Sequence, residues 1–168
     1  NLPKKKFKHF IILMSKTNAI RILELHKVKF DTINYVVDES DLSGETVALK
    51  VGVNPETVLK TLVCVGDKTG HAVFCIPVTQ ELNLKKAASA SGNKKVEMIK
   101  LKDLLPLTGY IRGGCSPIGM KKLFPTYIDE TAQLFESICV SAGVRGTQMK
   151  LSADDLLKLV NGVYADLI

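Results

Sequence analysis

Residues 58–65 of this chain read VLKTLVCV, residues 66–70 read GDKTG, and residues 72–78 read AVFCIPV. Two apolar runs rich in β-branched residues, joined by a short polar segment framed by glycines, are typical of a β-hairpin. The stretch therefore predicts two antiparallel strands that are neighbours in a sheet.

The segments on either side of the hairpin alternate between helical and strand patterns. Apolar spacing and capping residues predict helices, and short runs bounded by turn residues predict strands. The predicted helices are 17–27, 45–51, 84–91, 101–105 and one opening at 152–155; the predicted strands are 30–37, 96–99, 126–128, 137–141 and 147–151, with a second hairpin turn at 143–146. Strands in hairpins with helices between them favour an α+β domain with a mixed or mainly antiparallel sheet.

Lys60 is unusual within the first strand of the hairpin. In β geometry its side chain shares a face with Val58, Leu62 and Cys64. An ammonium group is costly on an apolar face unless an anion meets it, although a lysine can also protect an edge strand or extend to water. Lys60 is therefore a candidate anion-binding residue.

Residues 113–119 read GGCSPIG and form a second candidate feature. Glycines allow a backbone to approach a ligand closely, and they also serve as ordinary turn residues. The loop is no P-loop, because the residues after Gly119 are not the required Lys and Ser or Thr, and Pro117 removes one N–H donor. No G-x-G-x-x-G follows a strand, so dinucleotide binding has no support.

Composition fits one domain and leaves several partners open. The chain has 168 residues, 46% of them hydrophobic, which is enough for one core and short for two. The net charge of +6 comes in large part from lysines at positions 4, 5, 6 and 8, so the body is only mildly basic. Such a charge permits RNA binding without requiring it.

The first 13 residues are interpreted separately. Their apolar part, residues 7–13, is interrupted by Lys8 and His9, and it is too short and too charged for a signal peptide or a membrane span. Met14 resembles a natural start. We predict that residues 1–13 are a leader or upstream extension and that residues 14–168 form a single domain, cytoplasmic and without membrane contact.

Four cysteines stand singly along the chain: Cys64, Cys75, Cys115 and Cys139. They lack the paired spacing of a zinc site and the density of a disulfide scaffold, which indicates reduced core thiols in a cytosolic protein. Cys115 could also be a nucleophile beside His26 or His71, but the sequence positions neither histidine. We expect no metal and no other cofactor.

Six blocks of sequence occur together in an order that resembles the YbaK/EbsC family: VLKTLV (58–63), LKKAA (84–88), KKVEM (94–98), TGY (108–110), GGCSPIGMKK (113–122) and VSAGVRG (140–146). The resemblance runs from about Thr17 to the C-terminus, and residues 38–44 resemble the EbsC-like branch. It implies the fold of the prolyl-tRNA synthetase editing domain, a mixed, mainly antiparallel sheet partly curled into a barrel with helices packed outside.

The family resemblance also implies an activity, the removal of cysteine wrongly attached to proline tRNA. The implied partner is aminoacyl-tRNA, held by its 3′-terminal adenosine and acyl group. In the family mechanism the thiol of the substrate attacks its own ester carbonyl. Intramolecular attack has a high effective molarity, so the protein need not supply a nucleophile.

The catalytic residues implied by the resemblance are Lys60, Gly113 and Gly114. Backbone N–H groups of the two glycines would stabilise the developing oxyanion. The Lys60 ammonium would hold the phosphate of the terminal nucleotide or polarise the ester region.

The substrate-binding residues implied by the resemblance are Tyr35, Ser116, Pro117 and Ser141. Pro117 belongs with Gly113 to the G-x-x-x-P loop, Tyr35 lines the pocket, and Ser141 lies near the acyl group. Each polar side chain also has a structural alternative: Tyr35 at the surface of its strand, Ser116 tying its loop, and Ser141 capping a turn.

Two positions depart from the family pattern. Ser43 stands where many relatives have an aromatic residue, which changes one wall of the pocket, and Cys115 stands where relatives have an aliphatic residue, which disfavours a catalytic thiol.

Several alternatives stay open at this point. The substrate could carry alanine or another small residue, release could be hydrolytic, or the protein could bind tRNA ends or nucleotides without catalysis. The mildly basic body favours tRNA choice through a prolyl-tRNA synthetase over direct reading.

Overall fold

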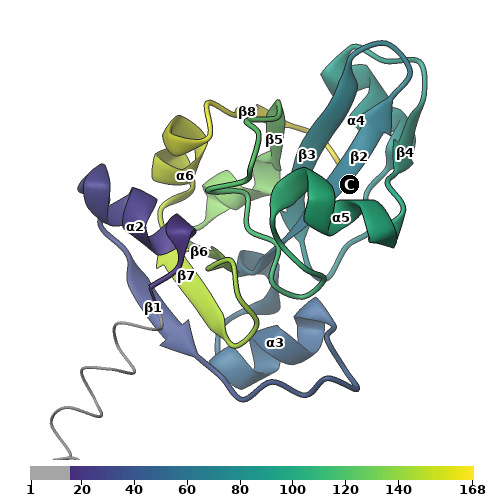
Figure 1. Cartoon of the computed structure of the whole chain (residues 1–168). Coiled ribbons are helices and arrows are strands. Elements are labelled where there is room, and N and C mark those ends of the chain that lie inside the picture. Colours follow the sequence, from purple (N-terminus) through teal and green to yellow (C-terminus); the bar gives the residue numbers. More distant parts are fainter. Residues whose placement is uncertain (1–15) are drawn as a thin grey trace, which may run out of the picture.

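The structure is a computed structural model that describes residues 16–168, so the predicted leader at residues 1–13 lies outside the described residues (Figure 1). Within that range it contains five α-helices and two β-sheets. The predicted α+β class is therefore confirmed. No helix in this part of the chain is long and apolar enough to cross a membrane.

The smaller sheet is antiparallel, with strand order β1-β7-β6. Its members are β1 (Asp31–Asn34), β7 (Thr147–Leu151) and β6 (Ile138–Ser141). Strand β1 is shorter than the predicted strand 30–37, because the chain leaves the sheet after one further bond, from the Tyr35 N–H to the Gly146 carbonyl. The predicted hairpin turn at 143–146 joins β6 to β7.

The larger sheet is mixed, with strand order β4-β2-β3-β5-β8. Its members are β2 (Leu59–Gly66), β3 (Gly70–Pro77), β4 (Val96–Met98), β5 (Thr126–Asp129) and β8 (Val163–Ala165). Strands β2 and β3 pair from Leu59–Pro77 to Gly66–Gly70, which confirms the predicted hairpin. Strands β5 and β8 run parallel to their neighbours. The sequence did not predict β8, a three-residue edge strand.

The two sheets meet at a β-bridge and do not curl into the barrel that the resemblance implied. Val58, just before β2, pairs in parallel with Cys139 of β6, and no second bridge extends this pair within residues 16–168. Further along, β4 takes the same edge of β2, from Cys64 to Gly66, so β6 cannot follow it. The prediction of a partly closed barrel is therefore wrong.

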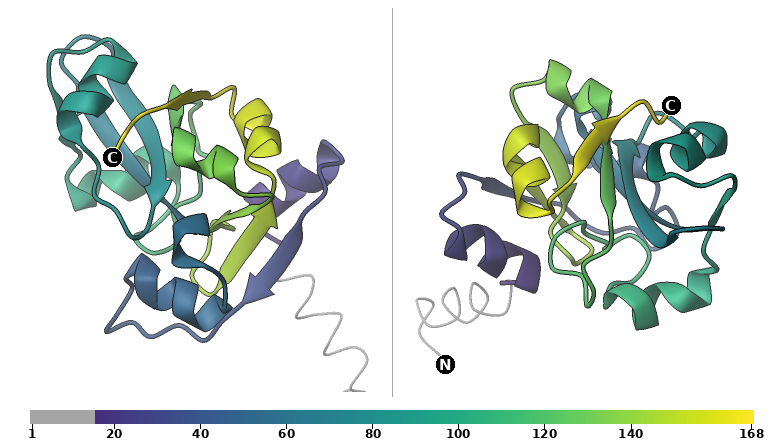
Figure 2. Two further views of the ribbon diagram at one scale, coloured as in Figure 1. Left: turned by 180° about the vertical axis from the view of Figure 1, so that it is seen from behind. Right: turned by 90° about the horizontal axis from the view of Figure 1, so that it is seen from above.

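The α-helices lie outside the sheets, with α4 and α5 beside the hairpin and α2 and α3 beside the smaller sheet (Figure 2). They are α2 (Asn18–Leu25), α3 (Gly44–Val51), α4 (Leu84–Ser91), α5 (Leu101–Thr108) and α6 (Ala153–Leu159). Helix α5 extends beyond the predicted 101–105 because the Thr108 hydroxyl donates to the Leu104 carbonyl and Gly109 adopts the left-handed conformation that ends the helix.

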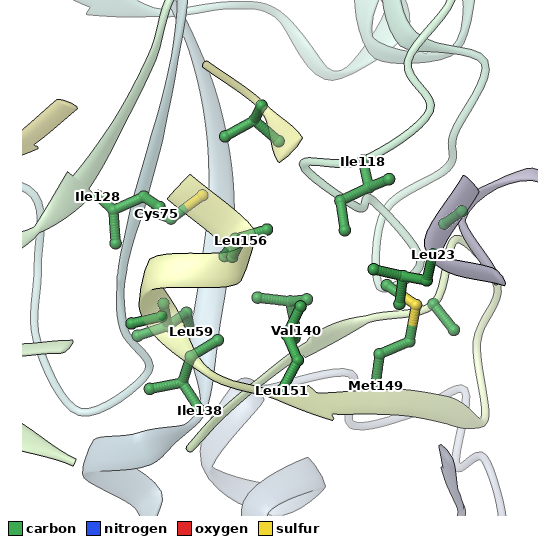
Figure 3. Packing of buried hydrophobic residues seen from close by; sticks show 14 of the residues in the cluster. Leu23, Leu59, Cys75, Ile118, Ile128, Ile138, Val140, Met149, Leu151 and Leu156 are labelled. Carbon is green, nitrogen blue, oxygen red and sulfur yellow. The ribbon is translucent and has the colours of Figure 1, made fainter. Parts of the chain in front are cut away.

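The main core joins both sheets to α2 and α6 (Figure 3). One face of the smaller sheet contributes Ile138, Val140, Met149 and Leu151, all at most 2% exposed. Packing of this face fixes which side chains of β6 and β7 point the other way, because successive side chains in a strand alternate. The site described next uses that opposite face.

Candidate functional site

Lys60 lies on the part of the β2 edge that neither β6 nor β4 occupies. Its side chain is 28% exposed, and its ammonium lies 3.6 Å from a carboxylate oxygen of Glu81, whose own side chain is 98% exposed. A surface ion pair of this kind is weak, since water screens it. The Lys60 cation is therefore available to an anionic ligand that displaces Glu81.

Ser141 ends strand β6 on the side facing this edge. Lys60 and Ser141 each lie two residues beyond the parallel Val58–Cys139 bridge on their own strands, so their side chains point to the same side of the sheets. The Ser141 hydroxyl oxygen accepts a bond from the Gly143 N–H at 3.2 Å, so it caps the turn, the structural alternative that the sequence left open. Its own proton stays available to a ligand.

The glycine loop packs against the β6–β7 turn. A β-carbon added to Gly114 would lie 3.1 Å from the Arg145 backbone nitrogen, so the two loops touch only because Gly114 has no side chain. The Gly114 N–H donates to the Ile111 carbonyl at 3.0 Å and is thus already used in a turn. Gly113, exposed and with φ of +83°, makes no such backbone bond within residues 16–168.

Ser116 and Pro117 are buried residues within the glycine loop itself. The Ser116 hydroxyl oxygen accepts from the Ile118 N–H at 3.2 Å, and the Ser116 side chain is fully buried. Both residues therefore hold the loop in shape from inside, which for Ser116 is again the structural alternative.

Tyr35 and Gly113 line one small hollow, although they lie far apart in the sequence. The other lining residues come from the loop after Tyr35 and from α3: Val37, Asp38, Asp41, Leu42, Thr46, Val47 and Lys50. Hydrogen bonds from Ser40 lower the pKa of Asp38, and those from Thr46 and Ser43 lower the pKa of Asp41. Two carboxylates and one ammonium, that of Lys50, therefore lie at this rim.

Two residues without a predicted role also lie at the site. Arg145 donates from Nε to the Arg112 carbonyl at 2.8 Å and lies next to Gly113, so it ties the turn to the glycine loop. Gln148 pairs with both Ile33 and Ser141 across the smaller sheet. The alternation of Gln148 and Lys150 with Met149 and Leu151 was the available signal in the sequence.

Ser43, the departure noted in the pocket wall, is the N-cap of α3, where its hydroxyl oxygen accepts from the Thr46 N–H at 3.3 Å. The next residue, Gly44, packs so closely that an added β-carbon would lie 2.3 Å from the Val78 side chain. The helix therefore begins directly against the end of β3.

Cys115 lies in the glycine loop but points toward the core, where it packs against the main cluster. Burial raises the pKa of its thiol to about 12, so the thiolate needed for nucleophilic attack is suppressed. Within residues 16–168 no group of three His, Cys, Asp or Glu side chains could hold a metal ion. The site thus offers a cation, hydroxyls and backbone groups.

Comparison with known proteins gives a consistent result. Residues 39–159 match the family described as the aminoacyl-tRNA editing domain. A protein of Enterococcus faecalis, which carries the provisional name Cys-tRNA(Pro)/Cys-tRNA(Cys) deacylase EbsC, is 55% identical over 152 residues, covering 90% of this chain and 93% of the relative.

Solved structures show the same fold. A crystal structure described provisionally as a trans-editing enzyme for prolyl-tRNA synthetase has a TM-score of 0.76 at 25% identity, covering 89% of this chain and 96% of that one. The hypothetical protein APE2540 has a TM-score of 0.81 at 18% identity, covering 90% and 99%. The predicted resemblance is confirmed, and this chain belongs to the YbaK/EbsC family of aminoacyl-tRNA editing domains.

Proposed function

We propose that this protein is a free-standing editing enzyme that removes cysteine from mischarged Cys-tRNA(Pro). The observation that carries the proposal is the 55% identity to EbsC over nearly the full length of both proteins. Such an enzyme is needed because a synthetase pocket separates amino acids of similar size by only about 1–3 kcal/mol per methylene group.

The proposed reaction uses the substrate as its own nucleophile. The cysteine thiol gives up its proton and its sulfur attacks the ester carbonyl carbon, which forms a C–S bond. The bond between the carbonyl carbon and the ribose oxygen then breaks, and the ribose oxygen takes up a proton. The products are free tRNA and a small-ring thioester. Burial raises the pKa of the Cys115 thiol and keeps it neutral, which supports this route.

The protein then has to hold the ester and stabilise charge. We assign Lys60 to the phosphate of the terminal nucleotide or to the ester region, since its weak pair with Glu81 can be exchanged. The Gly113 N–H is the better oxyanion donor of the two glycines, because that of Gly114 already bonds Ile111. Gly114 would serve by letting the loops meet.

The remaining roles are distributed around the same region. Tyr35 would line the acyl pocket with Gly113, and the free proton of Ser141 would donate to the acyl group. Pro117 and Ser116 would act from within the loop by fixing its shape. Aminoacyl-tRNA is the partner, and a prolyl-tRNA synthetase is the protein we expect to select the tRNA.

The decisive experiment is a panel of aminoacyl esters. Purified protein is incubated with Cys-, Ala- and Ser-tRNA(Pro) and with Cys-tRNA(Cys), and the released amino acid is measured over time. We expect release from both cysteinyl substrates, because the site contacts the acylated end. We expect serine and alanine to stay attached, because neither carries a thiol.

The chemical form of the product separates cyclisation from hydrolysis. Mass spectrometry at early times should detect the thioester before it hydrolyses to cysteine. Release of alanine at the rate of cysteine would contradict thiol-dependent catalysis, and binding of Cys-tRNA(Pro) without turnover would show a binding module instead.

A further inference from the structure

One polar atom of the smaller sheet has no hydrogen-bond partner in the part of the chain that the structure describes. Gln148 is 5% exposed, and its Oε1 is the one buried side-chain oxygen or nitrogen without a hydrogen bond among residues 16–168. Leaving a buried acceptor unpaired costs about 1–3 kcal/mol, so native structures rarely keep one without a use. The atom is therefore a candidate contact for a ligand.

The direction of the Gln148 side chain follows from the strand register. Its neighbours in β7, Met149 and the buried Leu151, belong to the main core together with Val140 of β6. Gln148 is directly opposite Ser141 of β6 on one side and Ile33 of β1 on the other. Paired residues share a face, so Gln148 points away from the core, toward the same side as Ser141.

Lys60 completes a row of three polar side chains. Lys60 and Ser141 each lie two residues beyond the Val58–Cys139 bridge, and Ser141 is directly opposite Gln148. Ser141 and Gln148 lie on neighbouring strands, about 4.8 Å apart, and Lys60 lies beyond Ser141 on the same side. One end of the row is a partly exposed cation and the other a buried neutral acceptor.

These two ends match the two ends of an aminoacyl-adenosine. The cation suits the phosphate side of the terminal nucleotide, and a buried amide oxygen suits a group with N–H donors. An aminoacyl ester carries such a group, its α-ammonium, next to the reacting carbonyl. A neutral oxygen can bind it without the large desolvation cost of burying a carboxylate.

On the basis of the proposed function, we propose that the Gln148 Oε1 accepts a hydrogen bond from the α-ammonium of the bound aminoacyl group. The contact fixes the acyl end while Lys60 holds the nucleotide end. It also makes a free α-amine a requirement, so acyl groups without one are bound poorly. Gln148 is thus a specificity-determining residue of the site.

The test removes the acceptor and, separately, the amine. Gln148→Met keeps the length of the side chain and deletes the polar atoms. The substrates are Cys-tRNA(Pro) and 3-mercaptopropionyl-tRNA(Pro), which retains the thiol and lacks the α-amine. Because the ammonium also activates the ester chemically, the informative quantity is the change in preference between wild type and variant.

We expect the variant to raise KM for Cys-tRNA(Pro) by about 10- to 100-fold, as for loss of a hydrogen bond to a charged group, and to leave the mercaptopropionyl substrate unaffected. Gln148→Glu should keep the preference for the amine. Gln133→Met, at an exposed glutamine of the 3-10 helix 130–134, is the matched control and should change neither substrate.

Equal losses on both substrates would show a structural role and overturn the proposal. Loss of the preference in Gln148→Glu would also overturn it, because the amide would then be a donor. Unfolding temperature should not fall in Gln148→Met, since an unpaired acceptor is removed.

A binding experiment separates this proposal from the proposed function. Calorimetry compares 3′-deoxy-3′-alanylamido-adenosine with its propionylamido counterpart. Both are amides that cannot be turned over, and only the second lacks the α-amine. Wild type should bind the first more tightly by about tenfold, and Gln148→Met should bind both alike. Equal binding by wild type would overturn the role of Gln148 whether or not the protein deacylates Cys-tRNA(Pro), and failed deacylation alone would count only against the proposed function.

Discussion

Strands β6 and β7 of the smaller sheet place different side chains on the two faces of that sheet. One face consists of Val140, Met149 and Leu151, all buried in the main core. The other face carries Ser141, which caps a turn, and Gln148, whose Oε1 lacks a partner within residues 16–168, beside the buried Cys139. Alternation along a strand thus lets adjacent residues serve packing and ligand contact separately.

The difference implies that mutations on the two faces should have different consequences. Losses on the apolar face should lower stability and leave the chemistry of folded molecules intact. Loss of the Gln148 amide on the other face should do the reverse, because its Oε1 makes no bond within residues 16–168 that the fold would lose.

The largest expected effect is that of Lys60→Ala, at the exposed end of the polar row. Deacylation of Cys-tRNA(Pro) should fall by at least about 100-fold, the loss typical of removing one electrostatic contact to a transition state. The unfolding temperature should stay the same, because the variant loses only a screened ion pair with Glu81. Single-turnover rates and thermal melts measure the two quantities.

The matched control is Lys95→Ala. Lys95 also pairs with a glutamate, Glu97, at 2.7 Å, but it precedes β4 at the far end of β2. A comparable loss of rate in this control would indicate a general effect of charge on RNA binding. Full activity of Lys60→Ala would contradict the proposed role of Lys60 in binding the substrate.

Met149→Ala, on the apolar face, should lower stability and leave the activity of the folded protein unchanged. Met149 is fully buried, and truncating such a side chain costs about 2–5 kcal/mol of unfolding free energy. Urea denaturation measures this loss, and kcat/KM at a temperature where the variant is folded should match wild type. A large fall in kcat/KM with unchanged stability would mean that the two faces are not independent.

The positions of most helices and strands were predictable from the sequence, but the way the two sheets assemble was not. The Lys60 hairpin, the 147–151 strand and the capped helix 84–91 have strong local signals, since turns, alternation and caps are short-range features. The barrel was wrong because closure depends on which strand takes a free edge, and that choice is made between segments distant in the sequence.

The site residues show the same limit. Gly113 was found by its motif, but the engagement of the Gly114 N–H with Ile111 is a turn bond visible only in three dimensions. Gln148 was missed, although its place in an alternating strand was readable. Its significance comes from burial without a partner, which no sequence pattern reports.

The buried thiol of Cys75, in the main core, predicts how the free energy of unfolding depends on pH. Burial raises the pKa of Cys75 to about 12, so above its ordinary value near 9 the unfolded chain loses this proton and the folded chain keeps it. The contribution of this thiol to the free energy of unfolding is therefore fully present below about pH 9. Above that pH the free energy of unfolding should fall by roughly 1 kcal/mol per pH unit for one such thiol.

Urea denaturation at pH 8, 9 and 10 measures this slope, and Cys75→Ala should reduce it. Cys139→Ala, in the smaller apolar cluster with Ala48 and Val58, should reduce it less, because the charge of Lys150 opposes the effect of burial on the pKa of Cys139. Equal reductions by the two variants would contradict the predicted difference in electrostatic environment between the two thiols.

The smallest effect is expected for Cys115→Ser, which tests whether the glycine loop contributes a nucleophile. Cys115 packs against the core, and its thiol is held neutral by burial, which raises its pKa to about 12. The hydroxyl should cost about 1 kcal/mol of stability, as for a polar group placed in an apolar setting, and leave deacylation within about twofold of wild type. A tenfold loss of rate at unchanged stability would instead show that Cys115 acts as a nucleophile, and a buried packing residue would then also take part in the chemistry.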